Sequence, residues 1–225
     1  MNFPFINIHT HKPCAEHALC ISNLFPDQFS DRNKNISGYF SVGIHPWYVK
    51  DKEYLEKQLS LLQETVSHPK CIAIGECGLD KVSKTPWDLQ KQAFAEQIKI
   101  SEKEDKPVII HCVKAWDDIL QMRKNENTRK KWIIHGFNSS MQMARQLIDS
   151  GCMLSFGSII LKSDSKAVNI LSELDFNDFF LETDDADISI EKIYEKSSEI
   201  RNENIDNLKS QQYKNFEHVF GKLSH

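Results

Sequence analysis

The sequence predicts a (β/α)8 barrel, and three observations lead to this fold class. Eight short apolar runs are spaced along its 225 residues. Most of these runs are continuously apolar rather than alternating, which is typical of parallel strands buried on both faces. Helical patterns separate most of the runs, as in a chain that alternates strands with crossover helices. A doubly wound open sheet is the alternative that the same alternation allows.

The expected elements follow in order along the chain. In the helix expected at 85–104, Thr85 is the predicted N-cap and Pro86 the first helical residue. We expect strands at residues 3–8, 18–25, 39–44, 71–75, 107–111, 131–136, 152–157 and 178–184. We expect helices at residues 51–67, 85–104, 115–123, 139–149 and 164–173, and a long polar helical tract at 188–220.

The early connections of the predicted barrel are short. Residues 12–17 and 26–37 are too short or too rich in Pro and Asn for full crossover helices. The chain is also shorter than the ~250 residues typical of this fold. We therefore expect a barrel with trimmed helices near its N-terminus. Because the chain has no repeat, low-complexity tract or break in composition, residues 1–225 are expected to form a single domain.

The charge and the cysteines limit the class of protein. A formal net charge of −4 provides no global field for polyanions, so any contact with nucleic acid must be local. Four of the six cysteines, Cys71, Cys77, Cys112 and Cys152, lie in or beside expected strands. They indicate buried, reduced thiols of a cytosolic protein. No signal peptide or membrane span is expected, so the predicted location is cytoplasmic, and a monomer is favoured.

Two histidines at the end of the first expected strand suggest the start of a metal site. His9 and His11 lie two residues apart, and side chains at that spacing point to the same face of a strand. Alone, the pair is equally consistent with two surface histidines. Five further residues with metal-type side chains also end expected strands, on the face where barrel enzymes build their active sites: His45, Glu76, His111, His135 and Asp184.

Such a set of residues fits a hydrolase with two divalent metal ions. Glu76 is expected to bridge the two ions, and Asp184 to bind one ion and accept a proton from the attacking water. The other ligands are expected to be imidazoles, which suit zinc, manganese, iron or cobalt better than magnesium. His45 precedes a proline and is expected to reach the substrate rather than a metal. The expected metal ligands are His9, His11, Glu76, His111, His135 and Asp184.

The loops that follow the strands indicate the kind of substrate. Lysines and aromatic residues there would suit a substrate with phosphate and stacking bases, although lysines are common on any surface. Acidic residues in the same loops weaken the positive field. After the sixth strand, Ser139 and Ser140 are expected to cap a helix rather than bind phosphate. The lysines are Lys12, Lys50, Lys81, Lys84, Lys114 and Lys162; the aromatic residues are Trp47, Trp116 and Phe137; the acids are Asp80, Asp185 and Asp187.

The sequence resembles the TatD family of metal-dependent hydrolases. The resemblance covers almost the whole chain and rests on ordered motifs, namely NIHTH, VGIHPW, AIGECGLD, PVIIHC, HGFNSS and LETD. It implies a TIM barrel, one to three divalent metal ions, and phosphodiester hydrolysis, often as a 3′→5′ exonuclease on DNA. We expect two divalent ions, of zinc, magnesium or manganese. The resemblance also implies that His9, His11 and Asp184 bind one ion, that Glu76 bridges, and that His111 and His135 bind the second ion.

The chain departs from the family pattern at three places. Asn7 stands where the family usually has Asp, which changes the charge beside the ligands. Val113 and Lys114 follow the HC motif in place of Arg-Asp, so a guanidinium clamp on phosphate is missing and Lys114 is only a point-charge substitute. The proline and Arg-containing segment that usually follows ETD is replaced by the start of a helix.

The leading hypothesis is a metal-dependent phosphodiesterase or deoxyribonuclease that acts on DNA, with Asp184 and Glu76 as catalytic residues and His45, Lys114 and Trp47 in contact with substrate. One alternative is an amidohydrolase-type enzyme that cleaves esters, amides or small phosphoesters. A third, less favoured hypothesis is a metal-binding interaction protein without turnover. The intact Asp184 argues against it, because a structural metal site needs no general base.

Overall fold

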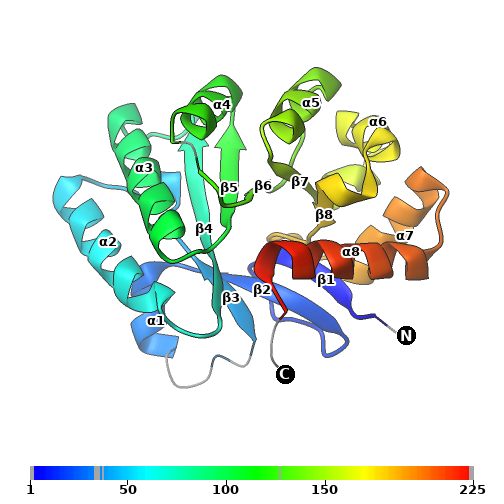
Figure 1. The fold of residues 1–225 in the computed structure, drawn as a ribbon, viewed down its shortest axis with the longest axis horizontal. Coiled ribbons are helices and arrows are strands. Elements are labelled where there is room, and N and C mark those ends of the chain that lie inside the picture. Colours follow the sequence, from blue (N-terminus) through cyan, green and yellow to red (C-terminus); the bar gives the residue numbers. More distant parts are fainter. Residues whose placement is uncertain (1–2, 33–35, 37, 127, 223–225) are drawn as a thin grey trace. The chain divides into compact units, whose positions relative to one another are not determined.

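The computed structural model describes residues 3–32, 36, 38–126 and 128–222. The chain divides into two compact units, one made of residues 1–22 and 134–225 and the other of residues 23–133. Figure 1 labels the helices and strands of both units. The prediction that residues 1–225 form a single domain stays a prediction.

The unit of residues 23–133 is built around a parallel sheet. Strands β3 (Tyr39–Val42), β4 (Cys71–Asp80) and β5 (Val108–Val113) pair in parallel in this order. Every residue of β4 is buried, as expected of a strand covered on both faces. The helices of this unit are α1 (Pro26–Arg32), η1 (Pro46–Tyr48), α2 (Lys52–Val66), α3 (Trp87–Lys103) and α4 (Trp116–Asn125).

The other unit joins the two ends of the chain. Strand β1 (Phe5–Thr10) pairs in parallel with β2 (Ala18–Leu24), and β7 (Met153–Phe156) pairs in parallel with β8 (Phe179–Leu181). Helices α7 (Ile190–Arg201) and α8 (Ile205–Phe220) pack against β1 and β8. The remaining elements are β6 (Trp132–Ile134), α5 (Met141–Asp149), η2 (Ser158–Leu161), α6 (Lys166–Glu173) and η3 (Phe176–Asp178).

The order of the strands confirms the predicted fold class. The eight strands are neighbours in chain order, β1 to β8, which is the order of a (β/α)8 barrel. A doubly wound sheet would reverse direction at its middle, and no such reversal occurs. The trimmed edge is also as predicted. No helix forms at residues 11–17, and α1 has only seven residues. Residues 33–35 and 37 of the predicted trimmed segment lie outside the described residues.

Two helix predictions were wrong in detail. Helix α3 begins at Trp87 with Pro86, not Thr85, as its N-cap, because Pro86 has an extended ψ of 132°. The tract at 188–220 is two helices rather than one. Asn202 adopts the left-handed conformation, with φ 48° and ψ 48°, and ends α7. Asn204 then caps α8 by accepting a hydrogen bond from the Asp206 amide at 2.7 Å. Asn is well tolerated both in the left-handed conformation and as an N-cap. The helical spacing of the residues continues across this break, so the pattern predicts one helix.

Strand β4 continues past Glu76, where the sequence predicts its end. Gly78 interrupts the apolar pattern, but the sheet requires a glycine at that point. Its φ is 142°, and a Cβ there would lie 2.1 Å from the carbonyl oxygen of His111 on β5. The two backbones can approach this closely only without a side chain. The strand therefore carries both Glu76 and Asp80 in fixed positions beside β5.

The four cysteines predicted to be buried and reduced are free and buried. A disulfide that the sequence did not predict joins Cys14, in the β1–β2 loop, to Cys20 on β2. In the described part of the chain, no helix combines the length and the apolar character needed to cross a membrane.

Tyr194 fastens β1 to α7. Its buried hydroxyl accepts a hydrogen bond from the Ile6 amide at 3.0 Å and lies 3.2 Å from the Ile6 carbonyl oxygen, to which it donates. Burial raises the pKa of this phenol, so the hydroxyl keeps its proton. This contact holds the strand that carries His9.

Replacing Tyr194 with Phe tests this contact. We expect Y194F to lower the free energy of unfolding by about 1–3 kcal/mol, because it leaves the buried Ile6 groups unpaired. For a chain of this length, each kcal/mol corresponds to a fall in Tm of about 2–4 °C. Y213F is the matched control, since the described contact of Tyr213 is a ring contact with Phe3. Equal Tm values for both variants would contradict the role of the Tyr194 hydroxyl.

Candidate metal-binding site

Three side chains converge at the end of β1. His9 is the fifth residue of β1, His11 follows the strand, and Asp184 lies in the segment after β8. Nε2 of His9 and Nε2 of His11 each lie 3.5 Å from the same atom, Oδ1 of Asp184. The His9 side chain is fully buried, whereas the side chains of His11 and Asp184 are 30% and 37% exposed. The group is therefore buried at His9 and open to solvent at His11 and Asp184.

Backbone hydrogen bonds set this geometry. The Asp184 amide donates to the His9 carbonyl at 3.0 Å, and the His11 amide donates to the Asp184 carbonyl at 3.0 Å. Thr10 and Asp184 thus form a parallel bridge next to β1. Asp184 adopts φ 54°, which is uncommon for a residue with a side chain and is found preferentially at functional sites.

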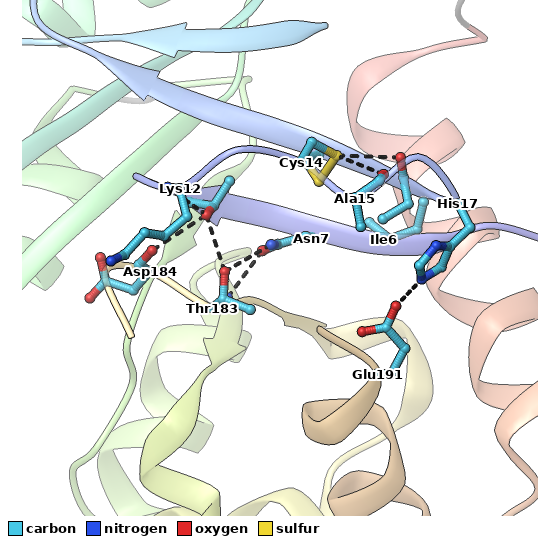
Figure 2. The surroundings of a disulfide bond; sticks show 12 residues. Ile6, Asn7, Lys12, Cys14, Ala15, His17, Thr183, Asp184 and Glu191 are labelled. Carbon is cyan, nitrogen blue, oxygen red and sulfur yellow. Dashed lines mark hydrogen bonds and ion pairs between the residues drawn. A yellow bond between two sulfur atoms is a disulfide. The ribbon is translucent and has the colours of Figure 1, made fainter. Parts of the chain in front are cut away.

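A line of buried polar side chains supports the bridge (Figure 2). The Asn7 amide donates to Thr183 Oγ1 at 2.9 Å, and the Thr183 backbone amide donates to Asn7 Oδ1 at 3.0 Å. Thr183 Oγ1 donates in turn to Thr10 Oγ1 at 3.1 Å, which also accepts from the Lys12 amide. An Asp at position 7 could not make the first of these donations when ionised. Asn7 therefore holds the residue next to Asp184.

His135 has a carboxylate partner that the sequence analysis did not assign. His135 directly follows β6, and its ring centroid lies 4.6 Å from that of His9. Glu182 is fully buried, with Oε1 3.4 Å from Nδ1 of His135 and 2.8 Å from the Gly136 amide that donates to it. A carboxylate of this kind orients a ligating imidazole. The available signal was the LETD motif, which places two acids at alternate positions.

A second group forms in the unit of residues 23–133. Oε1 of Glu76 on β4 lies 3.2 Å from Nε2 of His45 and 2.9 Å from Nδ1 of His111 on β5. All three side chains are buried. Nδ1 of His45 accepts a hydrogen bond from the Trp47 amide at 3.1 Å, which leaves Nε2 directed at Glu76. The structure therefore places His45, predicted to contact substrate, beside two predicted metal ligands.

Asp80 corrects one expectation. The sequence placed it among solvent-exposed acids that weaken a positive rim, but it is 2% exposed at the end of β4. Its Oδ2 lies 3.2 Å from Nε2 of His111 and accepts a hydrogen bond from the Trp47 indole at 2.5 Å. Burial alone would raise the pKa of Asp80, but hydrogen bonds from Trp47, the Val82 amide and His111 outweigh burial and lower it. Asp80 is thus an ionised partner that orients His111.

The remaining rim predictions have mixed outcomes. Trp47 and Lys114 are exposed, as a contact with substrate requires, and Lys114 has a left-handed φ of 54°. Phe137 is fully buried, so its predicted place on the rim was wrong; it packs edge-on against Phe156 in the core. Ser140 caps α5 by accepting a hydrogen bond from the Met143 amide at 3.2 Å, which confirms the capping interpretation.

The residues present fit divalent metal ions. Within each unit, two imidazoles and one carboxylate bring one ligand atom each to within 4.8 Å of the others: His9, His11 and Asp184 in one, and His45, Glu76 and His111 in the other. Imidazole with carboxylate is the donor set of zinc and manganese sites. Such groups, following the strands of a (β/α)8 barrel, define a metal-binding barrel protein.

Comparison with known proteins identifies the family. The family model described as TatD related DNase matches residues 28–221, and the chain belongs to this family. The uncharacterized metal-dependent hydrolase YabD of Bacillus subtilis is 33% identical over 149 residues, which are 65% of this chain and 58% of YabD. The deoxyribonuclease Tat-D of Schizosaccharomyces pombe is 26% identical over 156 residues, 64% of this chain and 50% of that protein.

A solved structure supports the fold. The crystal structure of YjjV, a TatD homologue from Escherichia coli K12, superposes with a TM-score of 0.82 at 22% identity and covers 97% of this chain and 98% of that one. The matched region spans 58% of the length of YabD and 50% of the length of Tat-D.

The orienting role of Asp80 leads to a prediction about metal affinity. We expect D80N to weaken zinc binding at the Glu76–His111 group by about 10–100-fold, because His111 loses its charged partner. Titration calorimetry of the demetallated protein measures this change. D88N is the control, since Asp88 is exposed on α3 and pairs only with Lys91 in the described structure. A zinc affinity of D80N equal to that of D88N would show that Asp80 does not orient a ligand.

Proposed function

We propose that the protein is a divalent-metal-dependent phosphodiesterase that acts on DNA, as a deoxyribonuclease of the 3′→5′ exonuclease type. The observation that carries this proposal is the group of His9, His11 and Asp184, in which two imidazoles face one carboxylate that remains open to solvent. Membership of the TatD related DNase family and the name of the S. pombe relative support the choice of DNA as substrate.

The chain's own residues have distinct roles in this proposal. His9, His11 and Asp184 would hold one ion, with His135 as a further ligand beside His9; in the other unit, Glu76 and His111 would be ligands. A bound divalent ion supplies charge neutralisation for the phosphate and a more acidic water. The backbone of Asp184 is held by two hydrogen bonds, and its partly exposed carboxylate accepts the proton from the attacking water. Zinc or manganese fits the imidazole-rich donor set better than magnesium.

The exposed cation Lys114 is proposed to contact the phosphate backbone. Lys114 directly follows β5, three residues after His111, and its backbone is left-handed, with φ 54°. Lys81, another lysine predicted for the rim, is held by Asp118 at 2.6 Å and so contributes less positive charge. The exposed Trp47 offers a stacking face next to His45.

A second candidate function is hydrolysis of esters, amides or small phosphoesters in the manner of amidohydrolases. The observation in its favour is Val113 at the position where an arginine clamp for phosphate is usual in the family. The same metal site could support hydrolysis of a phosphodiester or of an ester or amide, so the substrate that is turned over distinguishes the two functions. A cytoplasmic location and a monomeric state stay predictions.

The first experiment is digestion of a 5′-labelled single-stranded DNA oligonucleotide with Mg²⁺, Mn²⁺, Zn²⁺ or EDTA. We expect a metal-dependent ladder that shortens from the 3′ end and is abolished by EDTA. D184A is expected to lower the rate by about 100–10,000-fold, because it removes the general base. D187A is the control, since Asp187 is exposed in the same connection.

The outcomes separate the candidate functions. No cleavage of DNA by metal-loaded protein that hydrolyses an ester or amide would reject the nuclease and support the second candidate. Full activity of D184A on DNA, with metal still bound, would reject the role of Asp184.

A further inference from the structure

A pocket of about 240 Å³ lies beside His45, within the unit of residues 23–133. It is formed where the segment after β3 meets the start of α1 and the first turns of α2. Pockets for drug-sized ligands have volumes of about 300–1,000 Å³, so this one suits a single ring system rather than a whole oligonucleotide. The side chains that matter for its chemistry are Phe25, His45, Tyr48, Lys50, Tyr54 and Gln58.

Aromatic rings form much of the wall. The rings of Phe25 and Tyr48 meet edge to face with centroids 5.1 Å apart, and the Tyr48 ring lies 5.6 Å from that of His45. Tyr54 lies on α2, and the ammonium of Lys50 stands 5.0 Å from the centroid of its ring. The pocket thus combines faces for stacking with two exposed charges, the cation of Lys50 and the carboxylate of Asp27.

Gln58 is the residue that points to a ligand. It lines the pocket from α2 and is only 3% exposed. Its side-chain amide, with a carbonyl acceptor and two N–H donors, has no hydrogen-bond partner among the described residues and is not sealed from solvent, so it faces the pocket. An amide on a residue this deeply buried is normally paired with a residue, a water or a ligand. A ligand with a donor and an acceptor side by side would satisfy it.

We propose that this pocket binds the nucleobase of a nucleotide in the substrate. The base inserts among the rings of Phe25, Tyr48 and Tyr54, and the Gln58 amide pairs with adjacent donor and acceptor atoms on its edge. Lys50 contacts the attached phosphate. This inference rests on the proposed function, since it identifies the substrate of the same site as a nucleotide ester. The base would lie next to His45, whose Nε2 is 3.2 Å from Oε1 of Glu76.

The chemistry of the lining favours a nucleobase over other small ligands. An aliphatic chain would leave the Gln58 amide unpaired. A simple phosphate would leave the aromatic walls empty. A planar heterocycle satisfies both, and an amide side chain can form two hydrogen bonds with the edge of adenine.

The first arm of the test measures binding without turnover. The fluorescence of 2-aminopurine deoxyribonucleoside 5′-monophosphate is titrated with protein in EDTA, where stacking quenches it. We expect Q58L to weaken binding about tenfold or more, because two hydrogen bonds to the base edge are lost. Q63L is the matched control, since Gln63 is exposed on the same helix. We also expect Q58L to leave Tm unchanged or to raise it, because the amide it removes has no partner in the protein.

Y54L is a second variant that removes stacking rather than hydrogen bonding. We expect it to reduce the quenching and to weaken binding by about fivefold or more. The pocket assignment would be overturned if Q58L and Y54L both showed the same saturable quenching as Q63L. It would also be overturned if the wild-type protein did not bind the nucleotide.

The second arm measures base preference in turnover. With metal present, kcat/KM is compared for a deoxyadenosine dinucleotide and for the same dinucleotide with an abasic residue at either position. We expect Q58L to reduce the preference for the base-bearing dinucleotide about tenfold relative to Q63L. An unchanged preference in Q58L would overturn the pocket assignment while the phosphodiesterase function stands. If the wild-type protein cleaves neither dinucleotide, the proposed function fails and the binding arm alone decides the pocket.

Discussion

Two backbone hydrogen bonds between the end of β1 and the segment after β8 are the constraint on which the first metal-type group depends. They place Asp184 between two imidazoles that the strand has already directed to one face. The left-handed conformation of Asp184 turns the chain so that its carboxylate meets both rings. The supporting pairs, Asn7 with Thr183 and Tyr194 with Ile6, are buried and therefore rigid. Residues far apart in sequence thus act as one small scaffold.

The Glu76 group depends on a different device, the close approach of β4 and β5. Gly78 allows the two backbones to come together beside His111, and β4 then supplies carboxylates on both sides of that ring. Gln90 of α3 secures the strand end, because its side chain accepts from the Asp80 amide at 2.8 Å and donates to the Asp80 carbonyl at 3.0 Å. The imidazole is therefore oriented by two hydrogen-bonding acidic side chains before any ion binds, which lowers the cost of binding one.

The departures from the family pattern have structural consequences of different weight. Asn7 is integrated into the core, since its amide nitrogen makes a hydrogen bond that an ionised Asp could not make. Val113 ends β5 and Lys114 begins the loop after it, where a point charge takes the place of a planar clamp. The metal-type residues fit the family pattern, whereas Val113 and Lys114 depart from the pattern expected for a phosphate clamp. Substrate choice is therefore the property in which we expect this protein to differ from its relatives.

The barrel class, the order of its elements and the residues with metal-type side chains could be predicted without coordinates, because hydrophobic period and strand-end position are local properties of the chain. Tertiary structure decided which partners these residues have. The carboxylates of Asp80 and Glu182 pair with His111 and His135, respectively. Phe137, which was expected on the rim, lies in the core. The break at Asn202 and the continuation of β4 through Gly78 were likewise decided by backbone conformation and close packing. Burial and pairing are long-range properties, so a pattern along the chain cannot express them.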